Sequence, residues 1–458
     1  MTHLWTLHDI QHALGQSRTG ENVPIYNMHM DSRLVVTGDM FVALAGTPPA
    51  PFVSEFGSVR DGHAYVPQAV KNGASAVLVS APNDELNCPQ VLVPDTFQAL
   101  WRLAEEARER STAKRIAVTG SYGKTTTKDM LGLMLGGHKA ESSFNNCWGV
   151  PLTLVRLPKD APFAVLELGM SHMGELAPLA RLARPHVAIV TLVGPAHLQG
   201  LGTIDNVAQE KLSIQEGLSA DGILIARAAD VAQWPQLIRR KVLTFSAELH
   251  GTDASIEELW EEAGRLHVTA NVLNHKVKFT YPASGRHLLG NALAALLAVA
   301  ALGEDVVTLG QKLSQFELLE GRGATEVVNG VMVIDDSGNG QPLAMQAALR
   351  ALSQSAAPRK FALIGDMLEL GETEFEQHMA LKPLCEKLDG VWAVGTRIKP
   401  MYDALPVTHQ LGWVESAEQL NYPAIAGHLQ QGDALLVKAS KKILNVYDAV
   451  GQVKAALQ

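Results

Sequence analysis

The chain has 458 residues, of which 47% are apolar, and its formal net charge is −9. This length is enough for about three domains of ~150 residues, each able to bury a core. The acidic balance argues against a nucleic-acid partner, because such a surface needs clustered lysine and arginine. Any anionic ligand must therefore be bound by a few local cations.

Cysteine usage and hydropathy indicate a cytoplasmic protein. Its three cysteines, Cys88, Cys147 and Cys385, are far apart and form no CxxC pair, which favours neither a disulfide framework nor a zinc site. The first residues show no basic leader followed by an apolar core, so no secretion signal is expected. The most apolar stretch, residues 288–303, is shorter than the ~20 residues of a membrane span. We expect a buried helix there and no membrane insertion.

The first third predicts a small α/β domain over residues 1–112. The runs "GDMFVAL" and "ASAVLVS" are typical of strands, and "TFQALWRLAEEARER" is typical of a helix capped by Asp95 or Thr96. The polar run "ERSTAKR" then breaks the pattern and predicts the first domain boundary.

Residues 113–318 predict a central domain built on a parallel sheet. Apolar strand-like runs alternate here with helical segments, and the runs are "RIAVTG", "FAVLELG", "VAIVTLV" and "GILIA". Such alternation is typical of a parallel sheet covered on both faces by helices. The segment "RLHVTANVLNHKVKFTYP" alternates with period two and predicts an antiparallel hairpin at the sheet margin.

Residues 319–458 repeat the alternation independently and predict a Rossmann-like domain with strands in "VMVIDDS", "KFALIGDM", "GVWAVG" and "ALLVKAS". Asp335, Asp336 and Asp366 lie at or just past strand ends, where open α/β sheets bind ligands. The predicted fold is therefore α/β with three domains.

The segment "AVTGSYGKTTT", residues 117–127, predicts a phosphate-binding loop between a strand and a helix. Val118 stands where the common P-loop motif has glycine, but two glycines, a lysine and hydroxyls occupy the other positions that the mechanism requires. An ordinary strand-to-helix turn is the alternative. A loop of this kind predicts that the protein binds ATP or GTP, but it does not indicate which reaction the protein catalyses. The predicted nucleotide-binding residues are Gly120, Ser121, Tyr122, Gly123, Lys124, Thr125 and Thr126, with Thr125 also placed to bind Mg²⁺.

Three further residues stand out by their place relative to this loop. Glu167 ends a strand, His197 lies in the loop after the next strand, and Lys211 lies on a helix. Alone, each has an ordinary structural interpretation: a polar strand end, a structural histidine and a solvated lysine. Beside a P-loop, an acid at a strand tip is a candidate metal ligand.

Longer segments resemble the Mur ligase family over nearly the whole chain. The similarity rests on "TGSYGKTTTKDM", "FNNCWGVPLTL", the run from Leu166 to Gly202 and "ALIGDMLELGE". The N-terminal "DSR", "GDMFVAL" and "DGHAYVPQAVKNGASAVLV" resemble the uridine-nucleotide domain of the same family. The resemblance implies a uridine-nucleotide domain, a central P-loop ATPase domain and a C-terminal Rossmann-like ligase domain.

The family branch that these motifs resemble implies an ATP- and Mg²⁺-dependent ligase. It would join D-alanyl-D-alanine to UDP-N-acetylmuramoyl-tripeptide through an acyl phosphate, giving the pentapeptide precursor of peptidoglycan. Such a reaction needs no protein nucleophile, because catalysis rests on positioning and on neutralising crowded negative charge. We expect a monomer, and the third residue of the tripeptide, diaminopimelate or lysine, stays open.

The resemblance also implies roles for individual residues. Lys124 would hold the β- and γ-phosphates, Thr125 and Glu167 would share one Mg²⁺, and His197 with an N-carboxylated Lys211 would bind a second. The expected catalytic residues are thus Lys124, Glu167, His197 and Lys211. The remaining expected contacts are Asn291 to adenine, Arg322 to phosphate and Asp336 to ribose, and Ser32, Arg33, Asn145 and Asn146 to the substrate.

Several positions depart from the family pattern. Leu288 replaces an asparagine of the usual HNxxN, Gly338 and Gln341 replace a tyrosine and an asparagine of DDSYNANP, and Ser213 replaces the glutamate of KGEI. The usual KGSR reads "KASK" at residues 438–441. The phosphate and metal positions are retained, which favours an active ligase.

Three alternative functions can be compared with this ligase on the sequence alone. The diaminopimelate-adding relatives carry a DNPR motif and the folylpolyglutamate relatives a GKGS motif, and neither motif is present. A P-loop module that binds nucleotide without ligating anything is the third. Retention of Glu167, His197 and Lys211 argues against it, because a binding module needs no second metal site.

Overall fold

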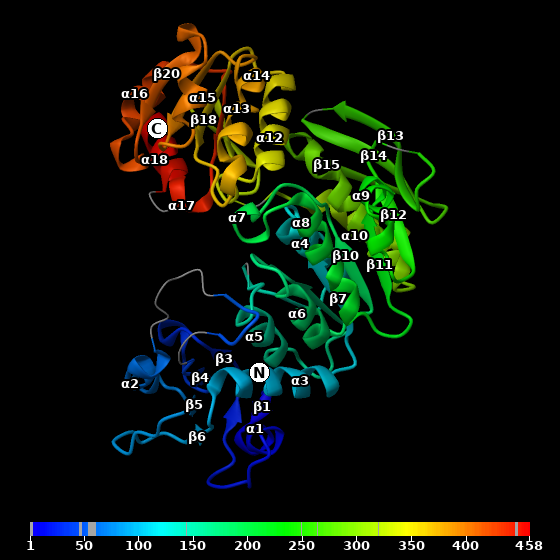
Figure 1. Cartoon of the computed structure of the whole chain (residues 1–458), viewed down its shortest axis with the longest axis vertical. Helices are drawn as coiled ribbons and strands as arrows, with labels where there is room; N and C mark the ends of the chain where they lie inside the picture. Colours follow the sequence, from blue (N-terminus) through cyan, green and yellow to red (C-terminus); the bar gives the residue numbers. More distant parts are fainter. Residues whose placement is uncertain are drawn as a thin grey trace.

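The computed structural model describes residues 3–44, 48–53, 61–142, 144–248, 250–262, 264–318, 320–444 and 448–458. Three sheet-based bodies follow one another along the long axis of the molecule, as Figure 1 shows, with the N-terminal body at one end and the C-terminal body at the other. The predicted α/β fold class is confirmed.

The N-terminal body holds a four-stranded parallel sheet in the order β3-β4-β5-β6. The helix α3 begins at Thr96 because the Asp95 carboxylate accepts hydrogen bonds from the N–H groups of Phe97 and Gln98. The elements of this body are β1 (Trp5–Thr6), α1 (Leu7–Ala13), β2 (Pro24–Ile25), β3 (Met28–His29), β4 (Met40–Val42), α2 (Val66–Lys71), β5 (Ala76–Val79), β6 (Gln90–Leu92) and α3 (Thr96–Glu109).

The central body holds a nine-stranded sheet in the order β15-β14-β13-β12-β11-β10-β7-β9-β8. Strand pairs from β8 to β13 are parallel, and β13, β14 and β15 pair antiparallel at one margin, so the predicted hairpin is confirmed. The strands are β7 (Lys114–Thr119), β8 (His138–Lys139), β9 (Phe163–Glu167), β10 (Val187–Val190), β11 (Ile223–Arg227), β12 (Val242–Ser246), β13 (Ala254–Glu262), β14 (Arg265–Val272) and β15 (His275–Pro282).

Helices cover both faces of this sheet, as predicted. One face packs against α4 and the buried, strongly apolar α10, and the other packs against α5 and α6. The α3 helix of the N-terminal body packs on α5, so one continuous apolar core joins the two bodies. The helices are α4 (Lys124–Leu135), α5 (Gly149–Val155), α6 (Leu176–Ala183), α7 (Leu198–Leu201), α8 (Ile204–Leu212), α9 (Ala228–Gln233), α10 (Leu289–Ala301) and α11 (Val306–Gly310).

The C-terminal body holds a six-stranded sheet in the order β16-β17-β21-β18-β19-β20, in which only β16 and β17 pair antiparallel. The four predicted strands are present, whereas β16 and β20 were not predicted. The strands are β16 (Ala324–Val328), β17 (Val331–Asp335), β18 (Lys360–Gly365), β19 (Gly390–Val394), β20 (Gln410–Val414) and β21 (Ala434–Lys438). The helices are α12 (Pro342–Gln354), α13 (Glu374–Met379), α14 (Lys382–Cys385), α15 (Lys399–Asp403), α16 (Tyr422–His428), α17 (Lys441–Leu444) and α18 (Ala449–Leu457).

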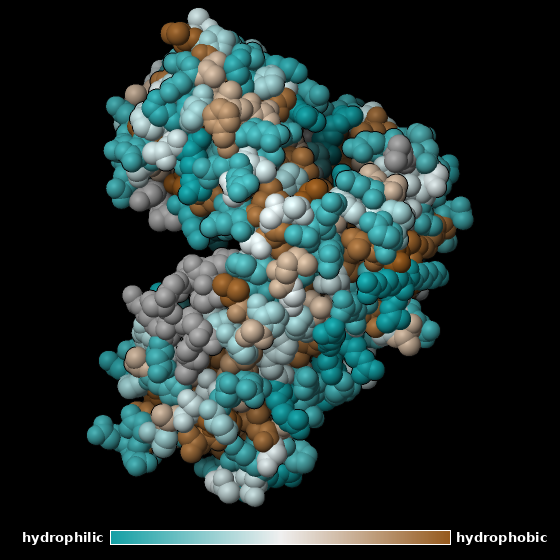
Figure 2. All heavy atoms as spheres, in the orientation of Figure 1, coloured by the Kyte–Doolittle hydropathy of each residue, from teal (hydrophilic) through white to brown (hydrophobic). Residues whose placement is uncertain are grey.

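The molecular surface is largely hydrophilic and is hollowed between the C-terminal body and the rest of the molecule (Figure 2). Among the described residues no helix is both long enough and apolar enough to cross a membrane. The arrangement places strand ends from the central and C-terminal sheets around the same hollow.

Candidate active site

The phosphate loop connects β7 to α4, and its two glycines are structurally required. Gly120 and Gly123 have φ angles of 147° and 82°, a region that other residues rarely adopt. A Cβ atom would collide with the Thr191 hydroxyl at Gly120 and with the Asn291 amide at Gly123. The Ser121 N–H donates to the Leu192 carbonyl at 2.9 Å, so the N–H groups that a loop ligand can use are those of the first turn of α4, which begins at Lys124 and where an anion binds favourably.

Lys124 and Asn291 both contact this loop. The Lys124 ammonium donates to the Gly120 carbonyl at 2.8 Å, and the Asn291 amide donates to the Gly123 carbonyl at 3.0 Å. Burial lowers the pKa of Lys124, the nearby Arg322 charge lowers it further, and Glu167 opposes both. Asn291, which the resemblance assigned to adenine, thus supports the phosphate loop in this structure.

Thr125 and Glu167 form a pair of oxygen ligands beside the loop. The Thr125 hydroxyl donates to Glu167 Oε2 at 3.0 Å, while the Asn145 amide donates to Oε1 at 2.9 Å. The Lys128 ammonium lies 3.6 Å from Oε2, and Glu167 is only 1% exposed. A hydroxyl and a carboxylate so close together suit Mg²⁺, which prefers oxygen ligands and usually takes the others from phosphate and water.

The residues that the structure describes contain no cluster of three or more His, Cys, Asp or Glu side chains able to hold a metal. Thr125 and Glu167 alone would supply two oxygen ligands to a cation. The fit is that of a nucleotide-carried Mg²⁺, in which the protein contributes one or two ligands.

His197 and Lys211 flank the same region. His197 precedes α7, and its Nδ1 lies 2.7 Å from the Glu369 carboxylate of the C-terminal body. Lys211, on α8, is 1% exposed, and its amine has no hydrogen bond or ion pair within the described ranges. Burial, and then the charge of Lys124, hold the pKa of Lys211 well below its ordinary value. Burial also lowers the pKa of His197, against the opposing effect of Glu369.

A cavity of about 300 Å³ is lined by Lys124, His197 and Glu369 and by further residues of all three bodies. The central body contributes predicted site residues, the N-terminal body contributes Phe52 and Val53, and the C-terminal body contributes Asn339, Gln341 and Glu369. The predicted residues that line it are Ser121, Lys124, Asn145, Asn146 and His197. The cavity therefore brings together five of the predicted site residues, whereas Thr125, Glu167 and Lys211 do not line it.

Ser32 and Arg33 are predicted substrate contacts that lie elsewhere, in a short 3-10 helix (Ser32–Leu34) between β3 and β4 of the N-terminal body. Ser32 is buried, and its carbonyl accepts from the Asn72 amide at 2.8 Å. The Arg33 side chain is 84% exposed and pairs with Asp31 at 2.6 Å. An exposed pair of this kind contributes little stability, so Arg33 is available to an anionic ligand.

The two residues predicted from the C-terminal body line two different cavities. Arg322 lines a cavity of about 360 Å³ together with Thr125, across from the phosphate loop. Asp336 lines a neighbouring cavity of about 850 Å³ with His287, and its carboxylate accepts from the Lys438 ammonium at 2.6 Å. Arg322 therefore faces the phosphate region, while Asp336 faces the larger space beyond it.

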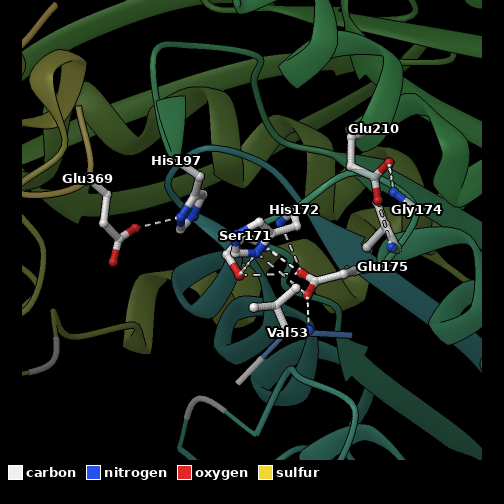
Figure 3. A network of polar contacts seen from close by, with 9 residues as sticks. Val53, Ser171, His172, Gly174, Glu175, His197, Glu210 and Glu369 are labelled. Carbon is white, nitrogen blue, oxygen red and sulfur yellow. Dashed lines mark hydrogen bonds and ion pairs between the residues drawn. The ribbon is translucent and has the colours of Figure 1, made fainter. Parts of the chain in front are cut away.

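Sequence reasoning missed several residues of the site, and Glu175 is one of them. Its buried carboxylate accepts from the N–H groups of Ser171 and His172 at 2.8 and 3.1 Å, and from that of Val53 at 2.9 Å (Figure 3). The contact to Val53 joins the N-terminal body to the cavity wall. The other missed residues are Lys128, Glu210, Glu369 and Lys438. An acid before an apolar helical run, and an acid just after a strand end, are the signals that point to Glu175 and Glu369.

Replacing Glu175 with alanine is expected to destabilise the protein. Each buried N–H left without an acceptor costs about 1–3 kcal/mol, so the free energy of unfolding should fall by at least that amount. The decrease is measured from the urea unfolding midpoint. The free energy of unfolding should decrease less in Glu175→Gln, which keeps one acceptor oxygen. An alanine variant within about 0.5 kcal/mol of wild type would contradict this role.

The fold and the site together define a phosphate-loop nucleotide-binding protein whose cavity is completed by three α/β bodies. The family model of the Mur ligase middle domain matches residues 118–299, and that of the Mur ligase glutamate ligase domain matches residues 321–441. The chain belongs to the Mur ligase family, which confirms the resemblance seen in its motifs.

Individual relatives are similar over nearly their whole length. The UDP-N-acetylmuramoyl-tripeptide–D-alanyl-D-alanine ligase of Rickettsia prowazekii is 31% identical over 96% of this chain and 98% of that protein. The crystal structure of MurF from Acinetobacter baumannii has a TM-score of 0.83 and 28% identity, covering 98% of this chain and 99% of that chain. The structure of MurF from Thermotoga maritima in complex with ADP has a TM-score of 0.78 and 27% identity, and the match covers 94% of this chain and 97% of that chain.

Proposed function

We propose that this protein is the ATP-dependent ligase that joins D-alanyl-D-alanine to UDP-N-acetylmuramoyl-tripeptide, giving the pentapeptide precursor of peptidoglycan. The observation that carries the proposal is the cavity in which Lys124, His197 and Glu369 meet beside the phosphate loop. Relatives whose names state this reaction support the choice of substrates. We further propose a cytoplasmic monomer with domains at residues 1–112, 113–318 and 319–458.

The site residues supply what the first step requires. The tripeptide carboxylate attacks the γ-phosphorus of ATP, and ADP leaves with the bonding electrons. Lys124 and the loop N–H groups hold the phosphates and neutralise the charge that builds up between two anions. Thr125 and Glu167 would hold Mg²⁺, which supplies further charge neutralisation when bound. Asn145 keeps the Glu167 carboxylate oriented through the hydrogen bond to its Oε1.

The second step forms the amide. The amine of D-alanyl-D-alanine attacks the acyl carbon, its proton is lost to solvent, and phosphate leaves with the electrons of the broken C–O bond. Walls from all three bodies line the cavity, and closure of these bodies around bound substrates would keep water from an acyl phosphate that it would hydrolyse. No residue of the chain has to form a covalent bond with the substrate.

The test of this function offers the purified enzyme ATP, Mg²⁺, D-alanyl-D-alanine and either the diaminopimelate or the lysine form of the nucleotide tripeptide. Product mass identifies the accepted third residue. Release of ADP that depends on both substrates supports the proposal, and ATP turnover that ignores them contradicts it.

The uridine nucleotide is expected to bind to the N-terminal body. The motifs "DSR" and "GDMFVAL" lie there, and exposed Arg33 offers a cation for the diphosphate. In the intact chain, UDP should slow hydrogen exchange in residues 29–44 and 61–80, and Arg33→Ala should weaken this protection. Protection confined to residues 321–441 would contradict the placement.

A further inference from the structure

Glu369 belongs to the C-terminal body, yet its carboxylate contacts a residue of the central body. It lies in the turn that follows β18, and its Oε2 is 2.7 Å from His197 Nδ1, a contact between residues 172 positions apart in the chain. In Figure 3, Glu369 lies on one side of His197 and the loop holding Ser171 and Glu175 lies on the other. Both His197 and Glu369 line the candidate catalytic cavity.

The backbone reinforces this side-chain contact. The Gln199 N–H donates to the Glu369 carbonyl at 3.1 Å, so α7 and the turn after β18 are docked by two hydrogen bonds. His197 and Glu369 have φ angles of 54° and 63°, a left-handed conformation that is unfavourable for non-glycine residues. Two strained residues that meet at one hydrogen bond indicate a defined contact rather than a passing surface pair.

We propose that Glu369 is a positioning residue that fixes the ring orientation and tautomer of His197 once the C-terminal body has docked, and this proposal rests on the proposed function. In the neutral imidazole, a carboxylate that accepts from Nδ1–H leaves Nε2 unprotonated, so Nε2 is the nitrogen able to bind a cation or accept a hydrogen bond. Carboxylate–histidine pairs orient metal-binding histidines in the same way. Docking and completion of the catalytic site are thereby coupled.

A purely structural ion pair is the competing interpretation. The side chains of His197 and Glu369 are 23% and 34% exposed, and an ion pair at that exposure contributes little to stability. Loss of a purely structural pair would therefore leave the cation affinity of the site and kcat unchanged. A positioning role changes both.

The experiment compares Glu369→Ala, Glu369→Gln and the control Glu372→Ala, which removes the same charge from an exposed position three residues away. Ring ¹⁵N spectra of the nucleotide-free protein report the tautomer of His197. The affinity for Mn²⁺ in the presence of ADP is read from the paramagnetic resonance of the free ion. Steady-state ligation then separates kcat from the KM for ATP.

Wild type and Glu372→Ala should show one tautomer with the proton on Nδ1. Glu369→Ala should show a mixture, bind Mn²⁺ about 10-fold more weakly and lose about 10- to 100-fold in kcat, with little change in the KM for ATP. Glu369→Gln, whose amide oxygen still accepts from Nδ1–H, should lie closer to wild type in all three measurements.

An unchanged His197 tautomer in Glu369→Ala would overturn the proposal, as would a Glu369→Gln variant no better than alanine in tautomer and Mn²⁺ affinity. The two proposals can fail separately. Changed spectra and Mn²⁺ affinity in a protein that does not ligate these substrates would leave Glu369 as a positioning residue and reject the proposed reaction. Ligation of these substrates by a Glu369→Ala protein with unchanged His197 spectra would support the proposed reaction and reject Glu369 as a positioning residue.

Discussion

Lys124→Ala is expected to reduce ligation by ~10²-fold or more, because it removes the cation that faces the transferred phosphoryl group. The Lys124 ammonium lies over the phosphate loop, where it donates to Gly120. Its charge matters most in the transition state, when phosphate and carboxylate oxygens approach each other. We therefore expect the loss mainly in kcat.

The fold should survive this change. Lys124 is the first residue of α4, its ammonium makes one hydrogen bond to the loop, and alanine is the best helix former. The control is Lys159→Ala, which removes an exposed lysine far from the loop in sequence. A folded Lys124→Ala protein with near-normal turnover would remove this lysine from the catalytic machinery.

Local signals in the sequence were sufficient for the phosphate loop and the strands around it. Gly120, Gly123 and Lys124 act within a few residues of one another, so their spacing alone predicts the turn and the anion site. Strands β1, β2, β3, β6, β8, β12, β13, β16 and β20 were not predicted. The reason is clearest in β13, "ASIEELWEE", where charged residues on an exposed sheet margin hide the alternation of a buried strand.

Contacts between bodies could not be predicted in the same way. The Glu369–His197 pair joins residues 172 positions apart in two different bodies, and no periodicity in the sequence indicates such a contact. Ionisable residues at strand ends were also ambiguous: Asp366 binds the N–H groups of Arg397 and Ile398, and Asp335 binds that of Gly321. Those carboxylates stabilise turns, and only the structure separates them from Asp336, which faces a cavity.

Lys211→Ala is expected to lose nearly all activity. Lys211 is fully buried near the positive charge of Lys124, and the carboxylate of its neighbour Glu210 is occupied by the N–H groups of Gly174 and Leu176. An ammonium so placed is unfavourable, which accounts for the direction of its lowered pKa and favours the neutral amine. A lysine in these surroundings is a candidate for chemistry that uses its amine rather than its charge.

A neutral amine can add CO₂. The nitrogen lone pair forms an N–C bond, one proton leaves to solvent, and the product is a carbamate whose oxygens suit Mg²⁺ as an amine does not. The resemblance implies this modification, and Ser213 in place of the usual glutamate makes the site a direct test of it. A free carboxylate should then substitute for the missing carbamate in Lys211→Ala.

Added formate or acetate is therefore expected to restore part of the activity of Lys211→Ala, measured as ligation at saturating ATP and Mg²⁺. The matched control is Lys124→Ala, which lacks a cation rather than a carboxylate, so neither anion should restore it. A Lys211→Ala enzyme that ligates without added carboxylate would exclude a catalytic role for this lysine. An unmodified Lys211 amine in metal-loaded crystals grown with ample bicarbonate would exclude the carbamate, because the buried amine would then have met CO₂ without reacting.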